Sequence, residues 1–350
     1  GDDLVTALIR SGLGVTNAIG AARYRMQGAI RGEGAAARLT LKVIDTESGR
    51  IIWAHRTEAG LRSDADHHER LARRVVAAVQ PHLRRAEIER ALGKPEQELT
   101  AYDLALRALP GVLALDADGN KRALDILQQA IDLDPDHGLA IALAAWAHAQ
   151  RVVYHFGSDL GSDRARGLEL AQRVQARSAD AMVLCILGNT LTLLDHLPGA
   201  EALIRKALAA DGSAAWAWSR SGWLDVYHGD PVSAVERFRI ALDLAPQDTL
   251  AFNSMVGIGC AHFMAGNYLD AARWQQRALL EHPSALWVHR TMCPAYVLAG
   301  AKAEATHSLQ ALRAGYPELT LSEVRRGMPP LPDATLDLIF GALSDAGLPS

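Results

Sequence analysis

Residues 215–248 read AWAWSRSGWLDVYHGDPVSAVERFRIALDLAPQD, and the spacing of the small residues in this stretch decides the fold. Gly222, Ala234, Ala241 and Pro246 follow one another at intervals of 12, 7 and 5 residues. The same four residue types stand 37 positions further on with the same intervals, at Gly259, Ala271, Ala278 and Pro283. A period of this length in a helical pattern is typical of a repeat built from two short helices.

The repeat extends over most of the chain. Displacements of 34 residues relate Gly188 to Gly222, Ala200 to Ala234, Ala207 to Ala241, Ala271 to Ala305, and Pro283 to Pro317. Near the start, the intervals of 12, 7 and 5 return at Gly111, Ala123, Ala130 and Pro135. A glycine-rich loop at residues 156–161 lengthens the second unit. The pattern predicts six units, at residues 104–136, 137–180, 181–214, 215–248, 252–285 and 286–319, and a terminal helix at 334–343.

Helix packing explains why these residue types recur. Each unit is a pair of antiparallel helices, and small residues such as Gly222 and Ala234 are needed where the two backbones approach closely. Phe238 is expected to fill the space between neighbouring units, and Pro246 to end the second helix. A single unit cannot bury its apolar face alone, so several units must stack in a row.

The residues Trp218, Gly222, Ala234, Phe238, Ala241 and Pro246 resemble the tetratricopeptide-repeat (TPR) signature. This resemblance implies a mainly α protein with a right-handed TPR superhelical solenoid. It adds to the repeat pattern a handedness and a concave face on which partners bind.

The first 92 residues follow another pattern. A short helix is expected at residues 3–9, and alternating apolar and polar residues predict strands at 24–31, 38–43 and 51–56. The short connections favour an antiparallel meander. A helix at 65–92 follows, ended by Gly93, Lys94 and Pro95. We therefore expect a small α/β module at 1–92 and the solenoid at 93–350.

This N-terminal region resembles part of the TolB-like module. The resemblance covers about residues 23–109 and is carried by YRMQGAIR (24–31), IDTESGRIIWA (44–54) and LTAYDL (99–104). In bacterial signalling proteins that module precedes repeats, and the upstream effector is a class III nucleotide cyclase or a winged-helix DNA-binding domain. The family's first strand and a middle strand–helix segment are absent here, and we expect the chain to be a piece of a longer protein.

Composition and charge argue against several classes of protein. A net charge of −4, from 36 Lys and Arg against 40 Asp and Glu, gives no electrostatic footprint for direct nucleic-acid binding. The most apolar run, 139–153, is shorter than a membrane span and contains His148 and Arg151. Cys185, Cys260 and Cys293 are widely separated, which favours buried reduced thiols in a cytoplasmic protein.

No motif predicts catalysis, a cofactor or a metal. The sequence has neither a GxSxG nucleophile motif nor a GxxxxGK[ST] phosphate loop. Gly32, Glu33 and Gly34 predict a hairpin turn rather than a dinucleotide site. Residues 66–69 (DHHE) are interpreted as a polar helix start, because adjacent histidines on a helix point about 100° apart and do not share one ion easily.

The TPR resemblance implies a binding groove lined by the first helix of each unit. Carried over to this chain, the groove positions hold Asn189, Thr192, Trp216, Ser219, Arg220, Trp223, Tyr227, Asn253, Trp287 and Arg290. Trp and Arg dominate binding hot spots, and Asn can pair with an extended peptide backbone. The alternative is that the tryptophans pack between helices as ordinary core.

These observations predict a non-catalytic regulatory scaffold that binds a protein or peptide in the groove. The lysines of the carboxylate clamp found in chaperone-binding relatives are missing, so an acidic C-terminal peptide is not favoured. Two alternatives remain open. The array acts in self-association, as the oligomerisation or regulatory region of a cyclase or transcriptional regulator, or it binds a small molecule.

Overall fold

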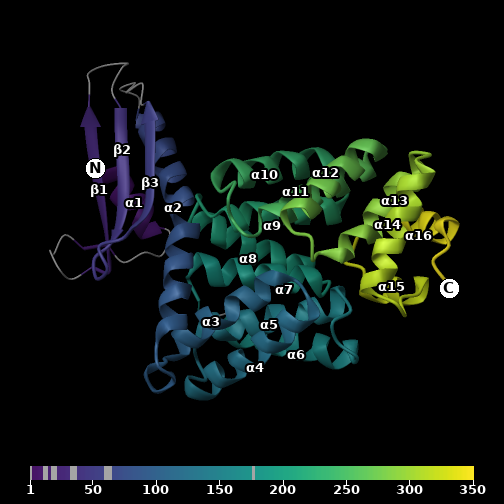
Figure 1. The fold of residues 1–350 in the computed structure, drawn as a ribbon, viewed down its shortest axis with the longest axis horizontal. Helices are drawn as coiled ribbons and strands as arrows, with labels where there is room; N and C mark the ends of the chain where they lie inside the picture. The colour runs from purple at the N-terminus through teal and green to yellow at the C-terminus, as the bar shows by residue number, and fades with distance from the viewer. Residues whose placement is uncertain (1, 11–14, 17–21, 32–37, 59–64, 176–177) are drawn as a thin grey trace.

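A repeat array of helices carries a small sheet at its N-terminal end (Figure 1). The computed structural model describes residues 2–10, 15–16, 22–31, 38–58, 65–175 and 178–350. The N-terminal part contains α1 (Asp2–Arg10), β1 (Tyr24–Arg31), β2 (Arg38–Asp45), β3 (Ile51–Glu58) and α2 (Ala65–Gly93). The predicted turn at residues 32–34 lies outside the described residues.

The three strands form an antiparallel meander in the order β1-β2-β3, as predicted. Gly28 on β1 pairs with Leu41 on β2, and Val43 on β2 pairs with Trp53 on β3. The turn between β2 and β3 is held by Asp45, whose Oδ1 accepts hydrogen bonds from the backbone amides of residues 47 and 48. Gly49 closes this turn with a φ of 72°, a conformation that favours glycine.

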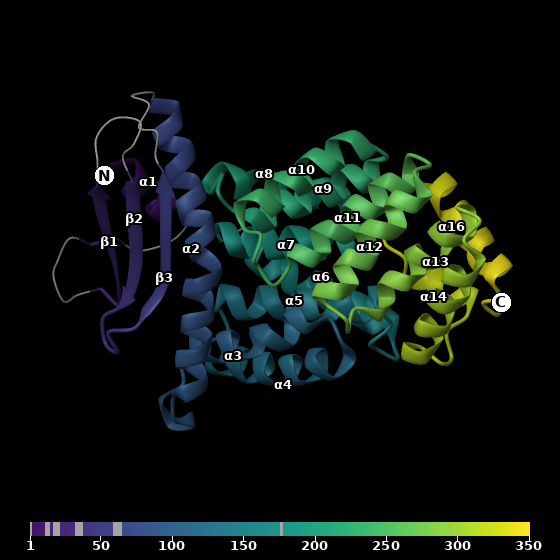
Figure 2. The ribbon, with the colours of Figure 1, turned by 45° about the horizontal axis from the view of Figure 1, so that its top comes forward.

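Helix α2 lies between the sheet and the repeat array (Figure 2). Val75, Val79 and Leu83 form the helix side of a small core with Leu41, Val43 and Trp53 of the sheet. Towards the array, the Gln80 amide donates to Asp211 at 3.1 Å, and the Arg84 guanidinium pairs with Asp248 at 2.9 Å. One long helix therefore connects the two parts of the chain.

Six helical hairpins follow α2 at the places of the predicted units, although α3 begins three residues before the first unit and α11 one residue before the fifth. Their helices are α3 (Ala101–Ala114), α4 (Ala117–Leu133), α5 (Gly138–Val153), α6 (Leu160–Gln175), α7 (Ala181–Leu193), α8 (Leu197–Ala210), α9 (Ala215–His228), α10 (Pro231–Leu244), α11 (Ala251–Met264), α12 (Tyr268–Glu281), α13 (His289–Leu298) and α14 (Lys302–Gly315). A 3-10 turn, η3 (Leu286–Val288), begins the sixth hairpin. After the hairpins come α15 (Leu321–Gly327), which the sequence pattern did not predict, and the predicted terminal helix α16 (Asp333–Ala346).

The ring of Phe238 sets the contact between the fourth and fifth hairpins. Phe238 on α10 is fully buried. A Cβ atom at Gly222 would lie 2.9 Å from this ring, and one at Gly257 on α11 would overlap it more severely. The prediction that Phe238 fills the space between neighbouring units is confirmed, and the structure adds that glycines on both neighbouring helices make room for the ring.

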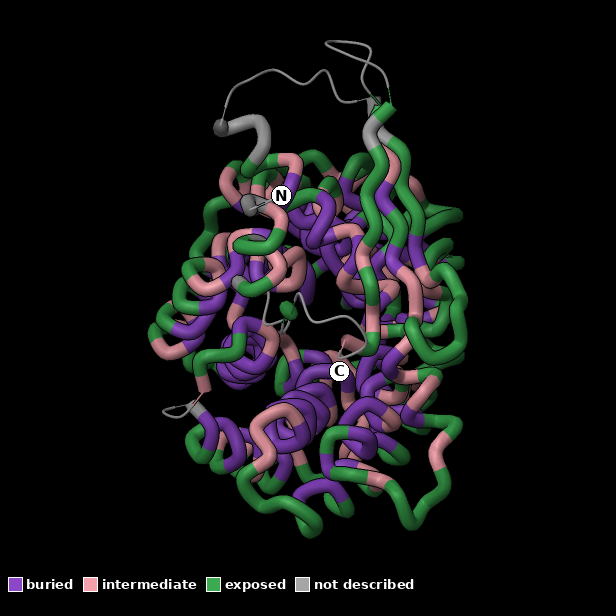
Figure 3. The backbone as a smooth tube through the Cα atoms, turned by 90° about the vertical axis from the view of Figure 1, so that its left-hand side faces the viewer, coloured by how far each residue is buried: buried purple, intermediate pink, exposed green. Residues whose placement is uncertain are grey.

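The superhelix is tight enough for distant repeats to touch. His282, after α12, lies with its Nε2 2.8 Å from the carbonyl oxygen of Ala114 at the end of α3. Arg290 on α13 donates to the carbonyl oxygen of Val153 at the end of α5, at 2.8 Å. Buried segments accordingly continue through the inside of the array (Figure 3). Among the described residues, no helix has the length and apolarity needed to cross a membrane.

We predict that Gly257→Ala lowers the free energy of unfolding by about 3 kcal/mol, because the new methyl group overlaps the buried Phe238 ring. Gly341→Ala is the matched control, since a Cβ atom at this helical position meets nothing within 4 Å. The control should stabilise the protein by about 0.5 to 1 kcal/mol through helix propensity. Urea denaturation followed by circular dichroism measures both, and equal effects of the two substitutions would contradict the packing role of Phe238.

Candidate functional site

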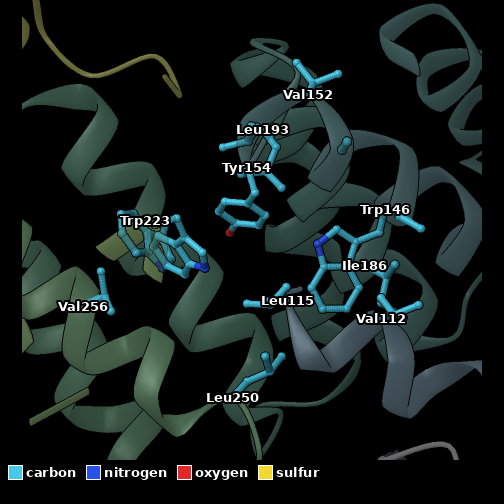
Figure 4. Close-up of a cluster of buried hydrophobic side chains, with 14 of the residues drawn as sticks. Val112, Leu115, Trp146, Val152, Tyr154, Ile186, Leu193, Trp223, Leu250 and Val256 are labelled. Atoms are coloured by element: carbon cyan, nitrogen blue, oxygen red, sulfur yellow. The ribbon is translucent and has the colours of Figure 1, made fainter. Parts of the chain in front are cut away.

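Nine of the ten predicted groove residues lie on the first helices of the third to sixth hairpins, and Trp287 lies in the 3-10 turn η3 just before α13. Nine of the ten are buried: Asn189, Thr192, Ser219, Arg220, Trp223, Tyr227, Asn253, Trp287 and Arg290. Trp216 is partly exposed. Apolar side chains from several repeats fill much of the space beside them, and Figure 4 shows Trp146, Tyr154 and Trp223 among these side chains.

Arg220 connects three consecutive hairpins. Its guanidinium donates to the side-chain oxygen of Asn189 on α7 at 2.7 Å, and to that of Asn253 on α11. The Asn253 oxygen also accepts from the Trp223 indole nitrogen at 2.8 Å. Ser219, next to Arg220, accepts from the same guanidinium and from Ser254. The structure therefore joins five of these polar side chains in one buried network across α7, α9 and α11.

Two of the ten residues make other contacts. The Thr192 hydroxyl donates to the carbonyl oxygen of Gly188 within its own helix, at 2.8 Å. Trp216 lies near the start of α9, where its indole nitrogen donates to Asp248 at 2.8 Å and its ring lies 4.3 Å from the Arg84 guanidinium carbon. Trp216 therefore contacts α2 rather than the network around Arg220.

Six of the ten residues, three of them members of this network, line one cleft on the concave face, with a cavity volume of about 50 Å³. They are Arg220, Trp223, Tyr227, Asn253, Trp287 and Arg290. Tyr154 from the end of α5 completes the wall and stacks on Trp287 with ring centroids 4.7 Å apart. Trp223 and Tyr227 stack at 5.8 Å. We call this site the aromatic cleft.

The aromatic cleft contains two buried cations and, among the described residues, no carboxylate. Burial lowers the pKa of Arg220 and of Arg290. Their hydrogen-bond acceptors are neutral: amide and hydroxyl oxygens for Arg220, and the carbonyls of Val153 and Trp287 for Arg290. Burial also raises the pKa of Tyr154 to about 12, so its hydroxyl stays protonated at neutral pH. The cleft is thus suited to groups that accept hydrogen bonds.

One donor in the aromatic cleft has no partner. The Trp287 residue is only 7% exposed, and its buried indole nitrogen makes no hydrogen bond. Unsatisfied buried donors are uncommon in folded proteins, because each costs about 1 to 3 kcal/mol. An acceptor that enters the cleft would remove this cost.

The segment between α15 and α16 forms part of the cleft wall. Met328, Pro329 and Leu331 line the cleft, and Leu331 is buried in the same apolar cluster. We call residues 328–332 the C-terminal strap. Groove positions taken from single repeats could not identify the strap or Tyr154, because neither belongs to a groove position. The proline-rich run MPPLP at 328–332 was the one sequence signal for a non-helical segment at this place.

Neither a thiol site nor a metal site is evident in the described part of the chain. Cys185, Cys260 and Cys293 are buried and free, and burial raises the pKa of each thiol, to about 12, 12 and 11. The described residues contain no group of three or more His, Cys, Asp or Glu side chains placed to hold a metal ion. The side chains of residues 66–68 in the DHHE segment lie outside the described residues.

Sequence comparison finds one partial relative. No protein-family model matches the chain. The putative adenylate cyclase 3 of Rhizobium meliloti (strain 1021) is 28% identical over 123 residues, which are 35% of this chain and 21% of that protein. The match thus spans about a fifth of the relative's length.

Structure comparison shows the fold. The crystal structure of the APC/C hetero-tetramer Cut9–Hcn1 is similar with a TM-score of 0.51 and 13% identity, over 74% of this chain and 48% of that one. Human IFIT1 with m7Gppp-AAAA has a TM-score of 0.48 and 16% identity, over 68% and 56% of the two chains. PilF of Pseudomonas aeruginosa has a TM-score of 0.40 and 16% identity, over 72% and 96%. The chain is a TPR solenoid with a small N-terminal three-stranded sheet.

We predict that Asn253→Leu lowers the free energy of unfolding by about 3 kcal/mol. The substitution keeps the branching of the side chain but leaves the buried Arg220 guanidinium and the Trp223 indole without their shared acceptor. Asn267→Leu is the control, because Asn267 is exposed and its side chain makes no capping bond. The control should change stability by less than about 0.5 kcal/mol in the same urea titration. Similar losses for the two variants would mean that the buried network contributes little.

Proposed function

We propose that the chain is a non-catalytic interaction scaffold that binds a peptide segment of a protein partner in the aromatic cleft. The TPR fold supplies a concave face built from several repeats. Aromatic and arginine side chains meet there in a desolvated pocket, which is the usual composition of a binding hot spot. No described residue cluster suggests a reaction.

The unpaired indole nitrogen of Trp287 is the observation that carries this proposal. A peptide backbone offers a carbonyl oxygen at every residue, and one such oxygen would satisfy the indole N–H. The stacked rings of Tyr154 and Trp287 present an apolar surface beside it. Arg290, which lines the same cleft, already binds two backbone carbonyls of this chain. The cleft therefore suits an apolar segment whose backbone is extended.

The C-terminal strap defines how such a segment would enter. The free volume of about 50 Å³ is far too small for a peptide, so Leu331 must move outward before a partner side chain takes its place. Burial of one leucine side chain is worth about 2 kcal/mol, which a peptide that buries a comparable side chain can offset. Met328 and Pro329 are already partly exposed.

We predict that Trp287→Phe weakens peptide binding about tenfold, because it keeps an aromatic ring but removes the indole N–H. Peptides would be selected from a displayed random library on residues 1–350, and their affinities measured by fluorescence anisotropy. Leu331→Ala should strengthen binding, since it loosens the strap. Trp274→Phe, on the outer helix α12, is the matched control and should change nothing.

Two results would reject the aromatic cleft as the binding site. In one, Trp287→Phe and Trp274→Phe bind the selected peptides with the same affinity. In the other, no peptide is selected at all. Thermal melting of each variant checks that lost binding does not reflect unfolding.

A second candidate function is the regulatory or oligomerising region of a bacterial signalling protein. It is supported by the partial similarity to the putative adenylate cyclase 3 and by the TolB-like residues at 24–31 and 44–54.

The edges of the N-terminal sheet give oligomerisation a physical basis. Among the described strands, β1 and β3 each have one edge that no other strand pairs. Unpaired edges are ready templates for strands of a second chain.

For this second function we predict a dimer in solution. Multi-angle light scattering on purified residues 1–350 should give twice the chain mass of 37.6 kDa. A lysine at an exposed position of the edge strand β1, such as Gln27→Lys, should return the protein to a monomer, because charged side chains on an edge strand oppose pairing with a second chain. A strict monomer for the unmodified chain would count against oligomerisation through this region.

A further inference from the structure

A second cavity lies between α2 and the array, with a volume of about 480 Å³. It shares no lining residue with the aromatic cleft. Its volume falls in the range of roughly 300 to 1,000 Å³ that is usual for small-molecule sites. We call it the junction cavity, because one wall comes from α2 and the other from the starts of α5, α7 and α9.

The walls of the junction cavity are mostly apolar. Leu83 contributes from α2, and Leu106, Leu139, Met182 and Val183 contribute from the array. An apolar body of modest size would fill this space and exclude water from both walls. Burial of such a body is the main source of affinity in cavities of this kind.

Beside the cavity, one backbone carbonyl of α2 lacks its usual helical donor. Pro81 lies inside this helix and has no N–H, so the carbonyl of Ala77, four residues earlier, lacks its i+4 helical donor. Ala77 and Pro81 both line the cavity, and Ala77 is buried. A hydrogen-bond donor on a ligand would satisfy this carbonyl.

The carboxylates of the cavity exceed its cations. Asp211 is only 3% exposed, and its oxygens accept from the Gln80 amide and from the amide and hydroxyl of Ser213. No Lys or Arg among the described residues pairs with Asp211 or with Asp180. Three hydrogen bonds satisfy part of the Asp211 carboxylate, but its negative charge has no cationic partner among the described residues, whereas buried charges are ordinarily paired.

The neighbouring cations are already engaged. Arg84 pairs with Asp248 and stacks over Trp216. Arg73, which lies beside Gly212, is paired with Glu69. Glu87, the remaining acidic residue of the lining, is neutralised by Arg23 and Arg90.

His137 adds no positive charge at neutral pH. Burial lowers its pKa, and its Nδ1 accepts a hydrogen bond from the Ala140 amide. The uncapped start of α9 at Ala214 adds a helix dipole, which stabilises the ionised form of a nearby carboxylate without removing its charge. The carboxylate excess of the cavity therefore persists.

We propose that the junction cavity binds a small organic cation, in which a primary amine is attached to an apolar body. The ammonium group donates to Asp211, and the apolar body lies between Leu83, Leu139 and Met182. Because the ligand contacts both walls, it favours the arrangement in which α2 is docked on the array. The site thereby connects the N-terminal module to the repeats.

Three analogues with one apolar body test the proposal on purified residues 1–350. These are 4-phenylbutylamine, the neutral 4-phenylbutanol and the anionic 4-phenylbutyrate, each measured by isothermal titration calorimetry at neutral pH. We expect one-site binding of the amine, at least tenfold weaker binding of the alcohol, and no binding of the carboxylate. Equal affinity for the amine and the carboxylate, or no binding of the amine, would overturn the proposal that the junction cavity binds an organic cation.

Substitutions in the lining of the junction cavity test whether the amine binds there. Asp211→Asn keeps the shape of the side chain and should weaken amine binding about tenfold while leaving alcohol binding unchanged. Met182→Trp fills the cavity and should abolish binding of both. Asp337→Asn, at an exposed position on α16, is the matched control. If Asp211→Asn does not fold, Met182→Trp still decides, since unchanged amine binding in that variant would place the ligand elsewhere.

Discussion

The arrangement of the array depends on the close packing of the Phe238 ring against Gly222 and Gly257. A side chain at either glycine would push α10 away from its neighbours, and the rotation between successive hairpins would change. Small rotations accumulate along a solenoid, so the spacing at each interface determines how tightly the superhelix winds. Here it winds until His282 reaches the end of α3 and Arg290 reaches the end of α5.

Tight winding changes the chemistry of the concave face. In an open solenoid the arginines of this face would be solvated, but here Arg220 and Arg290 are buried, and desolvation lowers the pKa of both. They retain their charge because several oxygens surround each guanidinium. The side-chain oxygen of Asn253 is central to this network, because it accepts hydrogen bonds from both the Arg220 guanidinium and the Trp223 indole nitrogen. The same crowding leaves Trp287 without an acceptor, which makes one place on the face unlike the rest.

The sequence predicted the elements well because their signals are local. The intervals of Gly222, Ala234 and Pro246 report helix crossings within one hairpin, and the alternation in β1 reports a half-buried strand. The winding of the superhelix results from the rotations at many helix interfaces. No single motif therefore predicts that Arg290 contacts Val153, 137 residues away in the sequence. For the same reason, the groove positions identified residues at the starts and along the first helices of the hairpins without showing that most of them lie buried. The junction cavity also escaped prediction, because its two walls come from different parts of the chain.

Helix α9 belongs to both sites. Its first residues, Ala215 and Trp216, line the junction cavity, while Arg220, Trp223 and Tyr227 on the same helix line the aromatic cleft. A helix of 14 residues moves as a rigid element, so a shift at its start is transmitted to the cleft without any intervening loop. Such a shift couples the sites only if the arrangement with α2 docked differs from the undocked one in where α9 lies. The contacts of Arg84 with Trp216 and Asp248 hold α9 to α2 at this point, and they are therefore the physical link through which occupation of one site would change the affinity of the other.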